Sequence, residues 1–379
     1  MQQESNAATA SGGGPYRVMV VDDSAVIRGL LTKALETDAE IKVVSTVANG
    51  QAAVDALRRL DIDVVVLDIE MPVMDGLTAL PKMLEVRPNL QVIMASTLTL
   101  NGASVSMKAL SLGAADYLPK PTTTTGINNA VDFKRDLVEK VKNWGKVARR
   151  KRGLPPGSAA APSEKASIQP KKLYQNPVTL RTSTIGRLDC LAIGSSTGGP
   201  QALFTLFRAL GRVERMPVFV TQHMPATFTT ILAEHLAQAS GMPAAEAKDG
   251  EAVVPGRIYV APGDFHMTVE GQTGRIQVRL NKNPPENFCR PAVDPMLRSI
   301  AKVYGPKTLF VMLTGMGQDG LKGARELVAA GSNVIAQDEA TSVVWGMPGS
   351  VATAGLCSAV LPLVEIGGYV KKTLLKAAA

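Results

Sequence analysis

The sequence predicts an α/β protein made of two doubly wound parallel-sheet domains that are joined by a flexible linker. Three observations predict this fold class. Short β-branched runs alternate with amphipathic helical stripes in two separate parts of the chain. The length of 379 residues suits two or three domains. Hydrophobic residues make up 45% of the chain and charged residues 20%, which is a globular balance.

The net charge of +8 comes from one segment of the chain. Residues 1–144 carry 14 basic and 17 acidic side chains, residues 189–379 carry 17 and 15, and residues 145–188 carry 10 and 1. This last segment contains a Pro/Gly/Ala/Ser-rich stretch that cannot bury enough apolar surface to order itself. We therefore predict a disordered N-terminus (1–15), a first domain (16–144), a basic linker (145–188) and a second domain (189–379).

Composition also excludes several classes of protein. No apolar run approaches the roughly 18–20 residues that span a bilayer, and the polar, glycine-rich N-terminus does not have the pattern of a signal peptide. We expect a cytoplasmic protein without membrane insertion. Cys190, Cys289 and Cys357 are too widely spaced for a disulfide framework or a tetrahedral zinc site, so we expect them to contribute to packing.

The first domain is expected to alternate strands with helices. A stripe that includes Leu30, Leu31 and Leu35 predicts an amphipathic helix. A last helix runs through Trp144, and the basic run 149–152 is expected to be its solvated end. The predicted strands are residues 17–21, 63–67, 91–95 and 115–118.

The second domain repeats this alternation. An apolar stripe at residues 202–210 predicts a helix, and residues 275–280 are expected in a local hairpin. The predicted strands are residues 189–193, 218–221, 257–260, 308–313 and 333–336.

Carboxylates gather at the strand ends of the first domain. Asp22 and Asp23 follow one strand and Asp68 follows the next, and the carboxyl ends of parallel strands lie at the same edge of a sheet. Crowded carboxylate oxygens suit Mg²⁺ better than zinc. Ser96 and Lys120 follow two further strands and add a hydroxyl and a counter-charge. Each aspartate alone can be a helix cap, but the five residues together predict a phosphoryl site.

These residues lie in segments that resemble the receiver domain of two-component response regulators, over residues 16–144. The segments are 21–24, 67–76 and 118–121. The resemblance implies a flavodoxin-type strand order and transfer of a phosphoryl group from a histidine kinase to Asp68. The other residues that it assigns to this reaction are Asp22, Asp23 and Asp68 with the Glu70 carbonyl for Mg²⁺, Ser96 and Lys120 for contact with the phosphoryl group, and Tyr117 for the switch.

A glycine-rich turn opens the second domain. Residues 194–199, Gly-Ser-Ser-Thr-Gly-Gly, lie between a predicted strand and a predicted helix. They match G-x-S-x-G, in which glycines permit a sharp turn that exposes a serine hydroxyl, and Ser196 is therefore the candidate nucleophile. A turn of this kind can instead bind phosphate or only close tightly, so the motif alone leaves both interpretations open.

A serine nucleophile needs a base, and the chain has three histidines. His235 lies on an apolar helical stripe, which favours packing. His266 lies in a predicted loop, where it can bind substrate or bond locally. His223 follows the 218–221 strand and reaches the same sheet edge as Ser196, so it is the best candidate.

An orienting carboxylate must come from the same edge. Asp319 follows the 308–313 strand, while Asp338 and Asp294 are its rivals, and Asp338 also ends a strand. The chain order Ser, His, Asp differs from that of the α/β-hydrolases, although a triad is defined by the roles of its members.

The second domain resembles the catalytic domain of the chemotaxis protein-glutamate methylesterases, over about residues 188–366. The segments that carry this resemblance are 192–199, 222–225, 261–263, 290–294, 313–320 and 337–339. It implies a larger, Rossmann-like second domain, and a receiver joined to it by a linker is that family's architecture. Gln318 and Ala292 depart from the family pattern, which has asparagine and serine there.

This second resemblance implies hydrolysis of glutamyl methyl esters on chemoreceptor helices, with release of methanol, and deamidation of glutamines. It implies control by phosphorylation, a triad of Ser196, His223 and Asp319, and no cofactor for the ester chemistry. Both reactions pass through a tetrahedral oxyanion. The backbone amides of Thr197 and Met316 are our candidates for holding it.

Two other functions compete with this interpretation. The pI near 9.3 suits a nucleic-acid-binding module, but the basic residues lie in the linker, and we find no helix-turn-helix pattern or aromatic-basic interleaving. The glycine-rich turn can also hold a nucleotide phosphate, but the acidic residue expected about 20 residues later is not evident. We therefore expect an enzyme whose partners are chemoreceptors and a histidine kinase, not nucleic acid.

Overall fold

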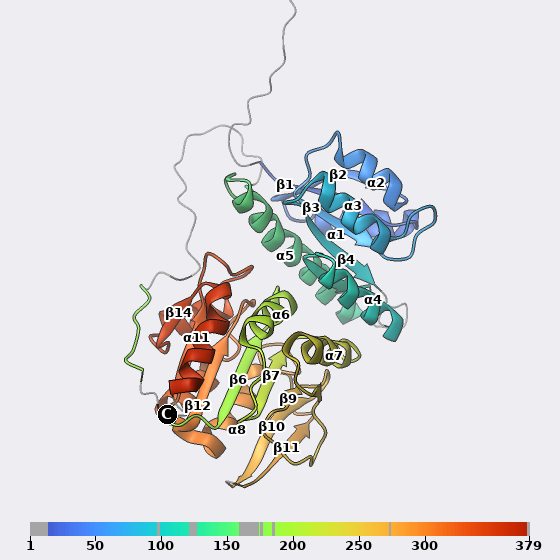
Figure 1. Cartoon of the computed structure of the whole chain (residues 1–379). Coiled ribbons are helices and arrows are strands. Elements are labelled where there is room, and N and C mark those ends of the chain that lie inside the picture. The colour runs from blue at the N-terminus through green and yellow to red at the C-terminus, as the bar shows by residue number, and fades with distance from the viewer. Residues whose placement is uncertain are drawn as a thin grey trace, which may run out of the picture. The chain divides into compact units, whose positions relative to one another are not determined.

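The computed structural model describes residues 14–96, 99–120, 127–158, 174, 177–183, 186–272 and 274–376. The chain forms two units, each built around its own parallel sheet (Figure 1). The predicted fold class of two doubly wound parallel-sheet domains is confirmed. The predicted disorder of residues 1–13 and the predicted linker at residues 159–173 lie outside the described residues.

The first unit alternates strands with helices, as its sequence predicts. Along residues 16–151 the elements are β1 (Tyr16–Val21), α1 (Ala25–Leu35), β2 (Ile41–Val47), α2 (Gly50–Leu57), β3 (Val64–Asp68), α3 (Gly76–Val86), β4 (Gln91–Ser96), α4 (Leu100–Ser111), β5 (Asp116–Pro119) and α5 (Ile127–Lys151). The strand order is β2-β1-β3-β4-β5 with every pair parallel, so the flavodoxin-type order is confirmed. Every residue of β3 is buried, which is typical of a parallel strand that is covered on both faces.

Two features of this unit differ from the prediction. The sequence analysis misses β2, an edge strand whose residues are mostly half-buried and which therefore has no continuous apolar run. Leu30 was assigned to the buried stripe of α1, but its side chain is 59% exposed. α1 buries only Leu31 and Leu35 fully, so its apolar stripe is narrower than the spacing suggested.

The C-terminal end of α5 is not simply solvated, as we had expected of a basic run. The helix passes the predicted domain boundary at residue 144, and Arg149 is buried. Its Nε donates to Asp63 Oδ2 at 3.1 Å, and its two terminal nitrogens donate to the carbonyl oxygens of Gly14 and Pro15 at 2.6 Å each. The expectation is wrong for this residue because the buried Asp63 carboxylate needs a cationic partner.

The second unit is larger. Its elements are β6 (Cys190–Ser195), α6 (Gly199–Leu210), β7 (Val218–Gln222), α7 (Phe228–Ser240), β8 (Ala244–Glu246), β9 (Ile258–Val260), β10 (His266–Gln272), β11 (Arg275–Asn281), α8 (Val293–Tyr304), a 3₁₀ turn (Gly305–Lys307), β12 (Thr308–Met312), α9 (Leu321–Ala329), β13 (Asn333–Gln337), α10 (Met347–Thr353), β14 (Ala359–Leu361) and α11 (Leu363–Lys376). Seven strands form a parallel sheet in the order β14-β13-β12-β6-β7-β9-β8. The predicted hairpin is confirmed as the antiparallel pair β10–β11.

The helices of the second unit cover its sheet on both faces. α6 packs against α7 and α11, whereas α8 packs against α9 and β10 (Figure 1). The apolar stripe predicted at residues 202–210 is buried in α6. The sequence analysis misses β8 and β14, which are three-residue strands at the two edges of the sheet.

Within the described parts of the chain, every helix is too short or too polar to cross a bilayer.

Candidate functional site

The sheet of the first unit brings the predicted phosphoryl-site residues to one edge. Asp22 comes directly after β1, and Asp68 is the last residue of the neighbouring β3. Ser96 ends β4, where it pairs in register with Pro119 of β5, and Lys120 follows. Since β1 and β3 lie where the strand order reverses, this edge is a place where ligands bind in open α/β sheets.

Three carboxylates and one ammonium group meet there. Ligand oxygens of Asp22, Asp23 and Asp68 all lie within 4.8 Å of one another. Lys120 Nζ lies 2.7 Å from Asp22 Oδ2 and 2.7 Å from Asp68 Oδ1. Burial raises the pKa of Asp68, and the hydrogen bond from Lys120 opposes this shift only in part. These hard oxygen donors fit Mg²⁺, which when bound would neutralise charge on a phosphoryl group.

Ser96, Tyr117 and Glu70, the other predicted residues of this site, differ in burial and in their position relative to the acidic cluster. Ser96 is buried, and its carbonyl oxygen accepts the amide hydrogen bond of Lys120 at 2.6 Å. Tyr117 is buried in β5, and burial raises its pKa well above the usual value. Glu70 is exposed in the loop that follows β3. The structure therefore places Ser96 and Lys120 at the acidic edge and leaves Tyr117 inside the sheet.

In the second unit, strand register places Ser196 beside His223. Ser195 of β6 pairs with Gln222 of β7, so the next residue of each strand leaves the sheet at the same level. The loop after β12, on the other side of β6, carries Asp319. Three neighbouring strands thus deliver the three predicted residues to one edge.

His223 and Asp319 are in direct contact. His223 Nε2 lies 2.7 Å from Asp319 Oδ2, and Asp319 is almost completely buried. The Asp319 carboxylate also accepts backbone N–H groups of Val293 at 2.5 Å and Asp294 at 3.1 Å. Burial raises the pKa of Asp319, but these hydrogen bonds and His223 outweigh it and hold the pKa below its usual value. Of the three candidate carboxylates, Asp319 is the one that meets the histidine, while Asp338 accepts from its own loop.

The two adjacent serines differ in environment. Ser195 is fully buried, and its Oγ donates to Gln222 Oε1 at 2.6 Å, whereas Ser196 is half-buried. Gln222 Nε2 donates to the backbone oxygens of Ser196 at 2.9 Å and His223 at 3.0 Å. Gln222 therefore holds the backbone of both residues, a role that the sequence analysis did not assign to it. Gly198 has φ +75°, which supports the predicted sharp turn.

The loop from Thr314 to Met316 lies against Ser196. The Ser196 N–H donates to the Thr314 oxygen at 3.0 Å, and a Cβ added to Gly315 would lie 2.9 Å from Ser196 Cβ. Among the described residues, no acceptor faces the backbone amide of Thr197 or of Met316. Within the described part of the chain, both amides are thus without a protein acceptor.

In the described part of the chain, the other two histidines, His235 and His266, make contacts within the fold and not with the predicted site. His235 packs against Phe204, with 5.8 Å between ring centroids, as the sequence predicts. His266 is buried at the start of β10, so the prediction of a loop residue is wrong for it. Its Nε2 donates to the Pro284 oxygen at 3.1 Å, and its Nδ1 accepts the Ala292 N–H at 3.2 Å. Both of its nitrogens are therefore used within the fold.

Sequence reasoning missed two residues that touch the pair. Cys289 Sγ lies 3.3 Å from His223 Nδ1, so the expectation that every cysteine serves packing is wrong for this one. Asn287 Nδ2 donates to Asp319 Oδ1 at 3.0 Å. The only signal in the sequence was their position directly before the 290–294 segment.

Comparisons with known proteins identify the family of each part of the chain. The family model described as CheB methylesterase matches residues 191–370, and the model described as response regulator receiver domain matches residues 18–132. A protein-glutamate methylesterase/protein-glutamine glutaminase of Azospirillum brasilense is 60% identical over 97% of this chain and 95% of its own length. The chain belongs to the protein-glutamate methylesterase/protein-glutamine glutaminase family. A family member from Rhodospirillum centenum (strain ATCC 51521 / SW) is 57% identical over 98% of this chain and 97% of its own length.

Solved structures are similar to the separate parts of this family member. The catalytic domain of Thermotoga maritima CheB methylesterase is 42% identical and covers 49% of this chain and 98% of its own, with a TM-score of 0.46. The response regulator domain of Thermotoga maritima CheB is 35% identical and covers 35% of this chain and 97% of its own, with a TM-score of 0.32. The family membership confirms the enzyme class predicted from the sequence, a chemotaxis methylesterase and glutaminase with a receiver domain.

Substitution of Gly315 by alanine should lower esterase activity at least tenfold. The added Cβ would overlap Met347 Sδ and crowd Ser196 Cβ, so the loop must shift away from Ser196. Overpacking of this kind costs about 1–3 kcal/mol of stability. Steady-state rates and thermal melting would measure both effects. Gly368→Ala in α11, where an added Cβ meets nothing within 4 Å, is the matched control. Wild-type rates for Gly315→Ala would contradict the prediction that hydrolysis depends on the position of Ser196.

Proposed function

We propose that the chain is a phosphorylation-activated hydrolase of the cytoplasm that acts on chemoreceptors. It demethylates glutamyl methyl esters with release of methanol and deamidates glutamines, with Ser196, His223 and Asp319 as its triad. The 2.7 Å contact between His223 and Asp319, at the sheet edge where Ser196 leaves β6, is the observation that carries the proposal.

In this proposal Ser196 Oγ attacks the γ-carbonyl carbon of a glutamyl methyl ester. Its proton passes to Nδ1 of His223, the nitrogen that does not face Asp319. The backbone amides of Thr197 and Met316 hold the oxyanion. The protonated histidine then returns the proton to the methoxy group, which leaves as methanol.

A water molecule completes the reaction in the proposed cycle. His223 takes a proton from it, the hydroxide attacks the acyl-serine, and Ser196 leaves with the proton from the histidine. The product is a glutamate side chain. For a glutamine the leaving group is ammonia, and the same groups serve. The buried, hydrogen-bonded Asp319 supports the scheme because it stabilises the imidazolium that forms in each half-reaction. The ester chemistry in this scheme needs no cofactor.

The receiver part of the proposal concerns Asp68. We infer that a histidine kinase donates a phosphoryl group to Asp68, with Mg²⁺ held by Asp22, Asp23, Asp68 and the Glu70 carbonyl. Contact of Lys120 Nζ with Asp68 Oδ1 supports its role as the partner of the phosphoryl group. We assign Ser96 and Tyr117 to sensing this change.

The proposed control assigns one task to each part of the chain. We retain the division into a receiver (16–144), a linker (145–188) and a catalytic domain (189–379), with α5 continuing into the second segment. The unphosphorylated receiver restrains hydrolysis on the receptor, and phosphorylation releases this restraint by population shift. A linker of this composition keeps the two domains at high effective concentration.

Methanol release from a methyl-esterified chemoreceptor tests this function. The full chain should hydrolyse the ester slowly on its own and several-fold faster with Mg²⁺ and a small-molecule phosphodonor such as acetyl phosphate. Asp68→Asn should keep the slow rate and lose the stimulation. Equal rates with and without the phosphodonor, in a protein shown to be phosphorylated, would remove the proposed control. No methanol release under either condition would remove the proposed activity.

A further inference from the structure

A tight turn at residues 286–289 lies beside the His223–Asp319 pair. Glu286 and Cys289 exchange two backbone hydrogen bonds, at 3.1 Å and 2.9 Å. The two central residues both have positive φ, +51° for Asn287 and +64° for Phe288, which is the pattern of a type I′ turn. Phenylalanine rarely adopts this conformation, so the turn is held in place by contacts rather than by local preference.

Asn287 connects two buried carboxylates. Its Nδ2 donates to Asp319 Oδ1 at 3.0 Å and to Asp294 Oδ2 at 3.2 Å. With this contact, Oδ1 of Asp319 is satisfied by Asn287 and by the backbone amides of Asp294 and Gly320. Oδ2 faces His223 and also accepts the Val293 N–H. Among the described residues, the amide of Asn287 is thus the one side-chain donor to Oδ1, and together with the backbone amides it holds the carboxylate in this orientation.

Cys289 touches the opposite side of the histidine ring. Because Asp319 takes Nε2, Nδ1 is the nitrogen that remains for Ser196, and Cys289 Sγ lies 3.3 Å from it. Burial lowers the pKa of His223, but Cys289 and Asp319 together outweigh it and raise the pKa to about 10. In this arrangement the imidazole is stabilised in its protonated form, which cannot accept the serine proton.

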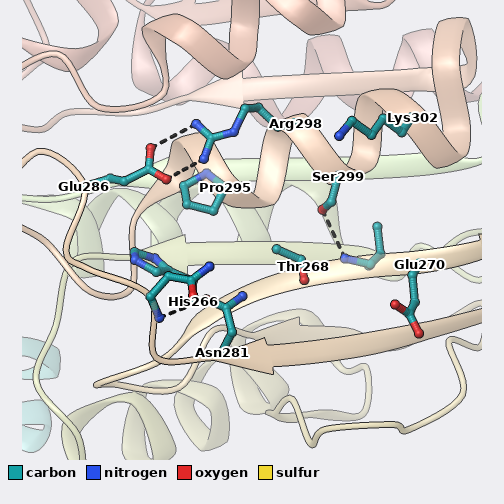
Figure 2. A pocket seen from close by; sticks show the side chains of 11 residues that line it. His266, Thr268, Glu270, Asn281, Glu286, Pro295, Arg298, Ser299 and Lys302 are labelled. Atoms are coloured by element: carbon teal, nitrogen blue, oxygen red, sulfur yellow. Dashed lines mark hydrogen bonds and ion pairs between the residues drawn. The ribbon is translucent and has the colours of Figure 1, made fainter.

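An ion pair anchors the turn to α8. Arg298 donates to both carboxylate oxygens of Glu286, to Oε2 at 2.9 Å and to Oε1 by a shorter contact. Figure 2 shows the two side chains facing each other at one end of a cavity of about 320 Å³, which α8, β10 and the turn enclose. Among the described residues, neither Glu286 nor Arg298 forms a side-chain hydrogen bond to His223 or Asp319, so the ion pair is assigned only to holding the turn.

We propose that this turn controls the readiness of His223 to act as a base. Asn287 orients the Asp319 carboxylate toward the ring, and Cys289 occupies Nδ1, the nitrogen that Ser196 needs. Both are positioning residues for the hydrolysis, and the inference rests on the proposed Ser196, His223 and Asp319 triad. Hydrolysis then requires that Nδ1 of His223 lose its contact with Cys289 and accept a hydrogen bond from Ser196 instead.

The pH dependence of kcat and KM for methanol release tests this inference in the full chain with phosphodonor and Mg²⁺. Cys289→Ala should move the acidic limb of kcat/KM to lower pH, because the contact with Cys289 that raises the pKa of His223 is lost. Cys289→Ser should also move it to lower pH, since a hydroxyl replaces the sulfur that contacts Nδ1. Asn287→Asp should move the limb to higher pH, because it adds a third carboxylate beside Asp294 and Asp319. Among the described residues, the titratable side chains shown against the pair are Cys289 at His223 and Asp294, which shares the Asn287 amide with Asp319.

A second measurement separates positioning from folding. Asn287→Gly keeps the positive φ of the turn and removes only the amide. It should lower kcat roughly 10-fold to 100-fold, the range that corresponds to the loss of a hydrogen bond to a charged group, with little change in KM or melting temperature. Asn283→Gly is the control, since its exposed side chain bonds to none of the described residues.

The outcomes distinguish this inference from the proposed function. Wild-type pH profiles for both Cys289 variants, or a kcat for Asn287→Gly equal to that of Asn283→Gly, would overturn the inference while an inactive Ser196→Ala keeps the triad. An active Ser196→Ala together with an inactive Cys289→Ala would identify Cys289 as the nucleophile and overturn both.

Discussion

Replacement of Ser196 by alanine should abolish methanol release and deamidation, with a loss of roughly 10⁴-fold or more. The strand-to-helix turn places this hydroxyl at the sheet edge that carries His223, and the proposed acyl intermediate forms on it. Thermal stability should hardly change, because Ser196 Oγ has no hydrogen-bond partner among the described residues. Rates on a methyl-esterified chemoreceptor and on its glutamine form would measure the effect.

Ser195→Ala is the matched control for this prediction. It removes the hydrogen bond to Gln222 Oε1, which costs about 1–3 kcal/mol of stability, but it should leave most of the activity. His223→Ala should also be inactive, and the double variant with Ser196→Ala should be no worse than either single one, since triad members act as a unit. If Ser196→Ala were active and Ser195→Ala inactive, the motif would have been interpreted one residue out of register.

Asp68→Asn should prevent phosphorylation completely. Asp22 and Asp23 are the other two carboxylates of the cluster, and the proposal needs them as metal ligands, so Asp68 is left as the acceptor. Acetyl phosphate with Mg²⁺ should add one acid-stable, base-labile phosphoryl group to the wild-type chain. Intact-protein mass spectrometry would count it.

Asp75→Asn provides the control for the phosphorylation experiment. Asp75 caps α3 through a 2.7 Å hydrogen bond from Thr78 N–H, and asparagine caps a helix equally well, so this variant should be labelled like the wild type. Labelling that survives Asp68→Asn, or that proceeds equally well with a chelator, would contradict the proposed carboxylate and metal site.

Much of both sites could be predicted because parallel strands align their carboxyl ends. Asp68 ends an apolar run, and Ser196 and His223 each follow one within three residues; such runs are visible in a single sequence. The edge strands could not be predicted in the same way. β8 and β14 have three residues each, and they are strands because β9 and β13 offer them unpaired backbone groups at the two edges of the sheet.

Packing decided several details that periodicity cannot encode. Leu30 has the spacing of a buried residue yet is 59% exposed, because α1 meets its sheet along a narrow stripe. Arg149 belongs to a basic run yet is buried, because Asp63 lies within its reach. Leu30 does not pack against the sheet, and the partner of Arg149 lies far away in the sequence. Spacing along the chain therefore predicted the wrong burial for both residues.

The sequence by itself determined the two parallel-sheet domains, the strand ends that carry the acidic cluster, and the glycine-rich turn with its serine. Local periodicity and glycine chemistry are enough for these features. Only the tertiary structure decided that Asp319, rather than Asp294 or Asp338, meets His223, and that Asn287 and Cys289 hold that pair. These contacts join residues 32 to 96 positions apart through loops, and the path of a loop depends on the elements that it connects and packs against.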